Sequence, residues 1–253
     1  MRTLPAAAAR AVGATKIYRS GMTAVRALDG VTVEFPEGRF TAIMGPPGSG
    51  KSTLLHCVAG LDRLSSGQAC LGCVDLGPLS DAELTLLRRE HVAFVFRSFN
   101  LVPTLTVREN ITLPLLLARK RPDPVLLDAV VDQVRLGDCL TRRPWEISRF
   151  QQQVVALARA LVSRPRIVFA DEPTGNLECR PGTELLRLFR QAVREFGQTS
   201  VMATHDPAAA AAAESVLFLS HGRLAGHLQH PTLASILDRS GPARPETVSS
   251  IGQ

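Results

Sequence analysis

The stretch "GPPGSGKST" at Gly45–Thr53 decides the fold class of this chain. It follows the apolar, strand-like run "FTAIM" and precedes the helical pattern "TLLHCVAGL", which is the order of strand, loop and helix that a phosphate-binding loop requires. Glycines let successive backbone N–H groups turn toward a phosphate, while Lys51 can reach the outer phosphates and Ser52 can ligate Mg²⁺. The stretch therefore predicts a nucleotide-binding α/β core.

Every residue of this loop is a candidate nucleotide ligand. Pro47 has no backbone N–H, so one contact that such loops can make is missing. Lys51 is also a candidate catalytic residue, because its positive charge can stabilise the γ-phosphate during transfer. The candidate phosphate-binding residues are Gly45, Pro46, Pro47, Gly48, Ser49, Gly50, Lys51, Ser52 and Thr53.

Length, composition and charge limit the classes of protein that fit. The chain has 253 residues, 45% of them hydrophobic and 21% charged, so it can bury a large core. Its five cysteines are odd in number and scattered, which indicates a reduced, cytoplasmic protein. No run of about 18 apolar residues exists, so we expect no membrane span. The net charge of +6 is dispersed rather than massed in one block, and we expect no nucleic-acid partner.

Strand-like and helical patterns alternate along the chain. Short apolar runs predict strands at residues 25–35, 39–45, 166–172, 199–206 and 215–227. A helix is predicted at residues 182–195, between two of these runs.

We expect one domain over residues 1–253. Helical spacing dominates the middle of the chain and predicts an approximate helical insertion at residues 81–160, in which Trp145 packs into a core. Residues 239–253 have little apolar content and predict a flexible tail.

Two carboxylates end the apolar strand in "RIVFADEPTGNLE" at Arg166–Glu178. Asp171 can join Ser52 as a metal ligand, and Glu172 can accept a proton from an attacking water. Adjacent carboxylates are costly unless a cation pairs with them. His205 ends a later strand, "VMATHDP", where its ring can meet a γ-phosphate. Glu172 and His205 are therefore candidate catalytic residues.

The stretch "EISRFQQQVVALARAL" at Glu146–Leu161 is shaped like a helix start that presents N–H groups to a phosphate. The order of the phosphate loop, helical insertion, "ISRFQ", "VFADEPTGNLE" and "ATHD" resembles an ATP-binding subunit of an ABC transporter. The similarity covers about residues 12–237. The phrases "VFRSFNLVPTLTVRENITLPLLL" and "DEPTGNLE" are most similar to the group that powers lipoprotein release and macrolide efflux.

This resemblance implies a P-loop NTPase core with a mixed sheet and an inserted α-helical subdomain. It implies ATP and Mg²⁺ as cofactors, with ATP held between the phosphate loop of one subunit and the signature sequence of another. Ser148 and Gln151 occupy signature positions, and Tyr18 stands where the family stacks a ring on adenine. A membrane permease is implied to dock on Phe99–Leu117, which would place the protein on the inner face of the cell membrane.

Several positions depart from the family pattern. The signature Leu-Ser-Gly-Gly-Gln reads "ISRFQ" here, so Arg149 and Phe150 replace glycines that allow close approach to the γ-phosphate of the partner's ATP. Arg149 can instead offer a cation to that phosphate. Arg97 replaces a glutamine that ligates Mg²⁺, and arginine has no acceptor atom, although it can pair with Glu172 or a phosphate. Smaller departures are Val154, Glu178 and Cys179.

These departures predict that ATP binding is kept and that hydrolysis is weakened by Arg97, Arg149 and Phe150. Two alternatives remain open: a non-hydrolytic ATP-binding regulatory subunit, or the degenerate half of a heterodimeric ATPase pair. The resemblance favours an exporter. The sequence does not distinguish a homodimer from a heterodimer, and it does not identify the cargo.

Overall fold

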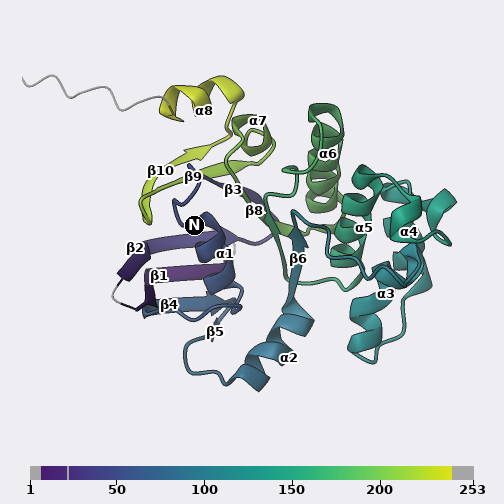
Figure 1. Ribbon diagram of the computed structural model, residues 1–253, viewed down its shortest axis with the longest axis horizontal. Helices are drawn as coiled ribbons and strands as arrows, with labels where there is room; N and C mark the ends of the chain where they lie inside the picture. The colour runs from purple at the N-terminus through teal and green to yellow at the C-terminus, as the bar shows by residue number, and fades with distance from the viewer. Residues whose placement is uncertain (1–6, 22, 241–253) are drawn as a thin grey trace, which may run out of the picture.

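The computed structural model describes residues 7–21 and 23–240 as two β-sheets flanked by helices (Figure 1). Within these residues the larger sheet has six strands in the order β10-β9-β3-β8-β7-β6. All neighbouring strands are parallel except β10 and β9, so the sheet is mixed and the predicted α/β class is confirmed. The strands are β3 (Phe40–Met44), β6 (Val92–Phe96), β7 (Ile167–Asp171), β8 (Thr199–Thr204), β9 (Ser215–Ser220) and β10 (Arg223–Gln229).

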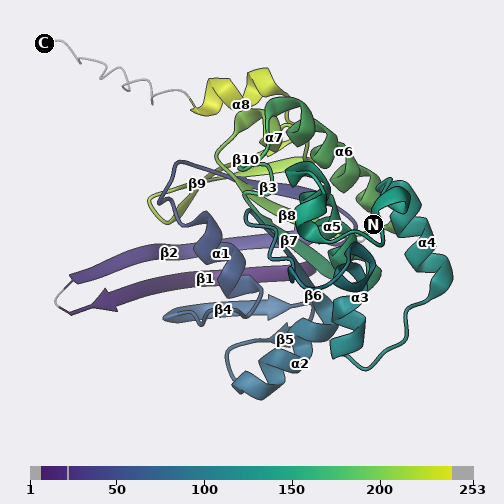
Figure 2. The ribbon, with the colours of Figure 1, turned by 45° about the vertical axis from the view of Figure 1, so that its right-hand side comes forward.

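The smaller sheet is antiparallel, in the order β2-β1-β4-β5. Figure 2 shows β1 and β2 as a long hairpin that extends away from the larger sheet. The second half of β2 alternates buried and exposed residues, because one face of this sheet packs on the core while the other meets solvent. The strands are β1 (Ala7–Ser20), β2 (Thr23–Pro36), β4 (Ser66–Leu71) and β5 (Val74–Asp75).

The helices follow the sequence signals for helix starts. Ser80, Thr106 and Ser148 each form a capping box with a Glu or Gln three residues later, which satisfies backbone N–H groups in the first turn. The helices are α1 (Lys51–Val58), α2 (Asp81–His91), α3 (Val107–Leu117), α4 (Pro124–Gln133), α5 (Arg149–Val162), α6 (Cys179–Phe196), α7 (Pro207–Ala210) and α8 (Leu233–Ser240). Short 3₁₀ helices lie at Gly137–Cys139 and Pro144–Glu146.

Alternate residues of the larger sheet face two separate cores. Ile43 and Phe169 pack with α1 and the antiparallel sheet on one face. Phe40 packs with α3, α5 and α6 on the other face, where its ring stacks on Phe189 with 5.9 Å between centroids. Helices α1 and α5 therefore lie on opposite faces of the larger sheet (Figure 1).

Helical spacing was predicted to dominate residues 81–160, and the structure places one strand among these helices, at Val92–Phe96. This "VAFVF" run forms β6, which pairs in parallel with β7 at the edge of the larger sheet. Its β-branched and aromatic residues suit a pleated, half-buried surface better than a helix. The helices that follow β6 pack together from α3 to α5, and the view of this part as a subdomain stays a prediction.

Two other expectations changed. Trp145 was predicted to pack into a core, but 61% of it is exposed, and the Arg143 guanidinium lies 5.3 Å from its ring centroid. The short 3₁₀ turn at Pro144–Glu146 buries Pro144 instead. Of the predicted tail, residues 239 and 240 belong to α8, and residues 241–253 lie outside the described residues.

Asn110 organises the loop that enters α3. Its side chain is fully buried, and its Oδ1 accepts a hydrogen bond of 2.8 Å from the Val102 N–H. Its Nδ2 donates to the carbonyl oxygens of Val102, Leu105 and Thr106 at 3.0–3.1 Å. One amide thus satisfies the backbone groups of a loop that makes few bonds of its own.

We expect Asn110→Ala to lower the free energy of unfolding by about 2–3 kcal/mol, because it removes the hydrogen-bond partner of the Val102 N–H and of the Leu105 carbonyl and leaves a cavity in place of a fully buried side chain. Urea denaturation followed by circular dichroism measures the loss. Thr112→Ala on the same helix is the control, since the Thr112 hydroxyl bonds only carbonyl oxygens of its own helix. Equal losses in the two variants would contradict this role for Asn110.

Candidate functional site

The loop between β3 and α1 is held by glycines that leave no room for side chains. An ideal Cβ on Gly45 would lie 2.1 Å from the Leu219 carbonyl oxygen, and one on Gly50 would lie 2.3 Å from that of Ala27. Gly48 and Gly50 have φ angles of 77° and 102°, in the left-handed region. Gly50 is also the N-cap of α1 and provides no side-chain cap, so the first N–H groups of the helix face the loop.

Lys51 fills the space inside this loop. It is 6% exposed, and its ammonium group donates to the carbonyl oxygens of Gly45 and Pro46 at 2.9 Å each. Burial lowers the pKa of Lys51, and the nearby charges of Glu172 and Asp171 oppose that shift. The hydroxyl of Ser49 is buried in the same loop without a hydrogen-bond partner. A buried cation beside an unpaired hydroxyl suits an anionic ligand such as a phosphate.

Ser52 and Asp171 come together from opposite ends of the sequence. The Ser52 hydroxyl donates to Asp171 Oδ1 at 2.9 Å, which joins the start of α1 to the end of β7. These two oxygen ligands fit Mg²⁺, which in phosphate sites usually takes one or two protein oxygens and completes its shell with phosphate and water. The metal-ligand assignment of both residues stays a prediction.

Glu172 and His205 also meet, at the ends of β7 and β8. His205 Nδ1 lies 2.8 Å from Glu172 Oε1. Glu172 has a φ angle of 48°, which is uncommon for a residue other than glycine, and its N–H donates to the Ala203 carbonyl at 3.0 Å. Because the strands are parallel, their carboxyl ends deliver both side chains to the same edge as the phosphate loop.

Tyr18 lies near the same edge, on β1. Its hydroxyl donates to Asp62 Oδ2 at 2.7 Å, and the Lys16 ammonium lies 4.9 Å from its ring centroid. Burial raises the pKa of Tyr18, and the bond to Asp62 adds to that rise. The ring is 42% exposed, so it has a free face for a flat ligand.

Ser148 and Gln151 do not lie with the phosphate loop, Asp171 and Glu172 in this structure. They lie at the start of α5, on the other face of the larger sheet from α1. The Gln151 N–H donates to Ser148 Oγ at 3.2 Å, and the Ser148 N–H donates to Gln151 Oε1 at 2.9 Å. Both side chains therefore cap the helix, and the Ser148 hydroxyl hydrogen stays available for a ligand.

The two bulky residues after Ser148 point in different directions. Arg149 is exposed, whereas Phe150 is half-buried and packs against the helical core. Phe150 and the nearly fully buried Val154 line one recess of about 440 Å³ together with Leu136 and Leu188. The side chain expected to hinder the approach of a partner's nucleotide is therefore that of Arg149. The Phe150 ring lies against the protein's own core.

Arg97 does not contact Glu172, the carboxylate that the sequence suggested as a partner for it. Its Nε donates to Asn176 Oδ1 and its terminal nitrogen donates to the Gly175 carbonyl oxygen, both at 3.0 Å. Asp171 is bonded to Ser52 instead, and Glu172 is bonded to His205.

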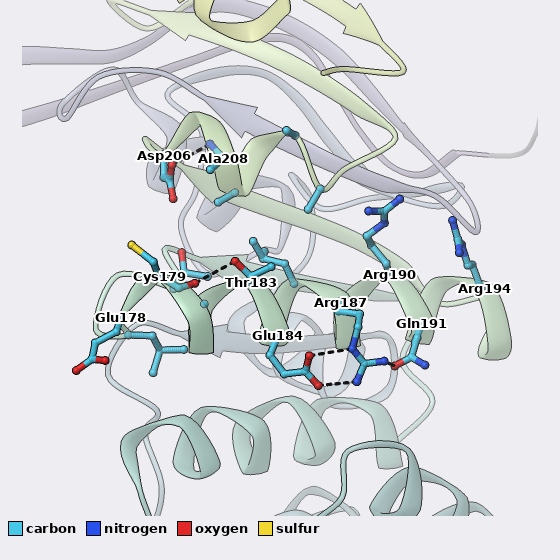
Figure 3. Close-up of a pocket in the computed structure, with 17 residues that line it drawn as sticks. Glu178, Cys179, Thr183, Glu184, Arg187, Arg190, Gln191, Arg194, Asp206 and Ala208 are labelled. Carbon is cyan, nitrogen blue, oxygen red and sulfur yellow. Dashed lines mark hydrogen bonds and ion pairs between the residues drawn. The ribbon is translucent and has the colours of Figure 1, made fainter. Parts of the chain in front are cut away.

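A groove of about 720 Å³ lies away from the phosphate loop, between α6 and α7. Figure 3 shows Arg190 and Arg194 at one end of it and Glu178 and Asp206 near the other. Arg187 and Glu184, which also line the groove, form an ion pair along α6. Among the described residues no group of three or more His, Cys, Asp or Glu side chains could hold a metal ion, and the glycine-rich loop does not line this groove.

Sequence reasoning missed two residues of this region. Asp62 holds both Tyr18 and Lys16, and Asn176 holds Arg97. Asp62 stands in the turn after α1 and Asn176 in the turn after β7, where acidic and amide residues are common in any protein. The sequence around each position did not indicate which distant side chain it would bind.

The geometry agrees with comparisons to known proteins. The family model described as "ABC transporter" matches residues 28–175. The lipoprotein-releasing system ATP-binding protein LolD of Anaeromyxobacter dehalogenans is 39% identical over 221 residues, which are 86% of this chain and 92% of LolD. The macrolide export ATP-binding/permease protein MacB of Rhodopirellula baltica is 38% identical over 233 residues, which are 90% of this chain and 34% of MacB. The dimeric cassette MJ0796, solved in a post-hydrolysis state bound to ADP and Pi, has a TM-score of 0.79 and 34% identity, with 88% of this chain and 99% of that chain covered. A curated MJ0796 protein comes from Methanocaldococcus jannaschii.

We expect Gly50→Ala to destabilise the protein more than Gly48→Ala. Both positions have left-handed φ angles, but only at Gly50 does the new methyl group meet a backbone oxygen; nothing lies within 4 Å of a Cβ at Gly48. Both variants carry the backbone strain of an alanine in the left-handed region, about 1–2 kcal/mol. Only Gly50→Ala adds the clash with the Ala27 carbonyl oxygen. Thermal unfolding of the two variants measures the difference, and equal melting temperatures would refute the close packing.

Proposed function

The chain belongs to the ATP-binding subunits of the ABC transporter family, and we propose that it binds MgATP at an interface with a second ATPase subunit to drive an exporting membrane permease. The observation that carries this proposal is the meeting of Lys51, Ser52, Asp171, Glu172 and His205 at one edge of the larger sheet. Lys51 and the loop N–H groups would hold the phosphates, and Ser52 and Asp171 would hold Mg²⁺. Tyr18 would stack on the adenine.

A second ATPase subunit is supported by the separation of the two halves of the site. Ser148 and Gln151 begin a helix on the face of the sheet opposite α1, which supports the proposal that their ligand is the phosphate of a nucleotide on another chain. The related cassette MJ0796 is dimeric and was solved with ADP and Pi. We propose a paired arrangement in which the Ser148 hydroxyl and the start of α5 face the partner's nucleotide.

A permease partner is supported by apolar surface on α3. Leu116 and Leu117 are 71% and 66% exposed at the end of Phe99–Leu117, the segment proposed to dock the permease. Within the described residues every helix is too short or too polar to cross a bilayer. We propose that the permease holds the protein at the inner face of the cell membrane. The names of LolD and MacB, which refer to lipoprotein release and macrolide export, support an exporter.

Reduced hydrolysis is supported by the side chains of Arg97 and Arg149. Glu172 is paired with His205 and is placed to accept a proton from water. Arg97 offers no acceptor to Mg²⁺ or to that water. Arg149 adds a long exposed side chain where the family has glycine. We propose that the subunit binds ATP firmly and hydrolyses it slowly.

A second candidate is a subunit that binds ATP and does not hydrolyse it, either as a regulator or as the degenerate half of a heterodimeric pair. The engagement of the Arg97 guanidinium by Gly175 and Asn176 favours this reading, because the residue is committed to another contact. In a heterodimer, the intact phosphate loop and Glu172 would meet the signature of a different chain.

We expect wild-type protein to bind ATP with Mg²⁺, and Lys51→Ala to weaken that binding about tenfold or more, because a buried charge-assisted contact to phosphate is lost. Isothermal titration calorimetry measures both affinities. Lys120→Ala is the matched control, because Lys120 is an exposed lysine outside the loop. Equal affinities of the two lysine variants would contradict the assignment of the loop.

We expect the triple variant Arg97→Gln, Arg149→Gly, Phe150→Gly to hydrolyse ATP about tenfold faster than wild type or more, because it restores an acceptor near Mg²⁺ and opens the signature. Phosphate release under Mg²⁺ measures the rates, and Glu172→Gln provides the blank.

The double variant Arg97→Gln, Arg149→Gly is the control for this experiment. It keeps Phe150, whose ring packs against the core, so it separates a signature effect from a loss of stability. Wild-type hydrolysis as fast as that of both repaired variants would refute the weakening by Arg97 and Arg149.

A further inference from the structure

Arg97 lies where a cation is expected to turn toward the carboxylates, yet it turns away from them. In the pairing of β6 with β7, Phe96 lies opposite Asp171, so Arg97 is one residue beyond that pair and beside Glu172. Its guanidinium instead reaches across to the turn after β7 and donates to Asn176 Oδ1 and to the Gly175 carbonyl.

The contact between Arg97 and this turn is reciprocal. Besides accepting from the guanidinium, Asn176 donates from Nδ2 to the Arg97 carbonyl oxygen at 2.9 Å. The three bonds join two segments that are 79 residues apart, and they involve both the side chain and the backbone of Arg97. A fork of several fixed donors is what distinguishes arginine from lysine in such a contact.

Gly175 shows how closely the guanidinium packs. An ideal Cβ on Gly175 would lie 2.8 Å from Arg97 Nε and 3.1 Å from its Cδ. The φ angle of Gly175 is outside the left-handed region, so the backbone itself would accept another residue. A side chain at this position would therefore displace the Arg97 guanidinium without straining the turn.

The turn that Arg97 holds begins at the candidate general base. The Gly175 N–H donates to the Glu172 carbonyl at 3.0 Å, and the Leu177 N–H donates to the Thr174 carbonyl at 2.9 Å. Glu172 keeps its φ angle of 48° only while surrounding contacts fix it. Gly175 therefore bonds to both residues: its N–H donates to the Glu172 carbonyl, and its carbonyl accepts from Arg97.

The other end of the contact is fixed to α5. Gln153 Nε2 donates to the Phe96 carbonyl at 3.1 Å, and Arg159 donates to the carbonyls of Phe99 and Asn100 at 2.9 Å and 2.6 Å. The backbone around Arg97 is thus anchored to the helix that begins at Ser148, while its side chain is anchored to the turn after Glu172.

We propose that Arg97 is a positioning residue that clamps the turn Gly175–Leu177 and so fixes Glu172. The role of this clamp in catalysis rests on the proposed function, whereas the clamp itself does not. Arg97, Gly175 and Asn176 are all exposed, so each bond contributes modestly to global stability. The effect of breaking the clamp is local to the turn.

The test compares three variants that break the clamp from different sides: Arg97→Met, Asn176→Ala and Gly175→Ala. Amide hydrogen exchange of residues 174–177 in the nucleotide-free protein is expected to speed up about threefold to tenfold in each. The melting temperature and the exchange of the β-strands stay unchanged. Gly137→Ala is the matched glycine control, because a Cβ there meets nothing within 4 Å and its φ angle is also outside the left-handed region.

Two further variants separate positioning from a general structural role. Asn176→Asp keeps an acceptor for Arg97 but loses the Nδ2–H that donates to the Arg97 carbonyl, so its exchange is expected to lie between that of wild type and that of Asn176→Ala. When Arg97 is also changed to Met, the exchange is expected to match that of Asn176→Ala. The double variant Arg97→Met, Asn176→Ala is expected to exchange no faster than either single variant, because one shared contact is lost. Additive effects, or a rise in exchange throughout the chain, would overturn the clamp.

The outcomes for the clamp and for the proposed function are distinguishable. Unchanged exchange at residues 174–177 in all three clamp variants would overturn the clamp, whatever the protein does with ATP. Loss of ATP binding in the wild-type protein would overturn the proposed function and leave the exchange result intact. If both hold, Asn176→Ala and Gly175→Ala, which break the clamp but keep the Arg97 side chain, are expected to lower kcat of the measurable hydrolysis and to leave ATP affinity within about twofold.

Discussion

The carbonyl oxygens of Ala27 and Leu219 leave no room for a side chain on Gly50 or Gly45, and the site depends on this close packing. The first oxygen comes from the antiparallel sheet and the second from β9, so two separate parts of the fold press on one loop. A loop confined in this way presents its N–H groups and the start of α1 in a fixed direction. Lys51 and Ser52 then have definite neighbours, and Asp171 can be reached from α1.

The charges at this edge are arranged in short, separate contacts. The ammonium of Lys51 is bonded to carbonyl oxygens, Asp171 to a hydroxyl and Glu172 to an imidazole. Among the described residues, neither of these adjacent carboxylates forms an ion pair with a lysine or an arginine, so a metal bound here would supply the cation that the pair lacks. The charge of Lys51 acts on both carboxylates from inside the loop, whereas the Arg97 guanidinium is bonded to Asn176 and Gly175.

The altered signature is accommodated within the fold. Phe150 turns inward and lines the same recess as Val154, which is 1% exposed. A basic side chain at position 154 would lose its hydration in such a place, whereas valine and the phenyl ring suit each other. The start of α5 keeps its capping box, so the helix terminus that would face a phosphate is formed even though Arg149 extends from it.

Local patterns in the sequence determined the elements and their order. The run "GPPGSGKST" between a strand and a helix predicted the loop, "RIVFADE" predicted the strand that carries the two carboxylates, and the family resemblance followed from the order of motifs. The broad helical pattern hid β6, because a five-residue apolar run looks alike in a strand and in a buried helix.

Only the tertiary structure decided where the long side chains point. Arg97 meets Asn176 across 79 residues, Tyr18 meets Asp62 across 44, and Phe150 packs against the helical core and lines the same recess as Leu188 of α6. Backbone preferences reflect near neighbours and can be read from sequence, but the rotamer of a flexible side chain depends on which distant groups the fold brings within reach.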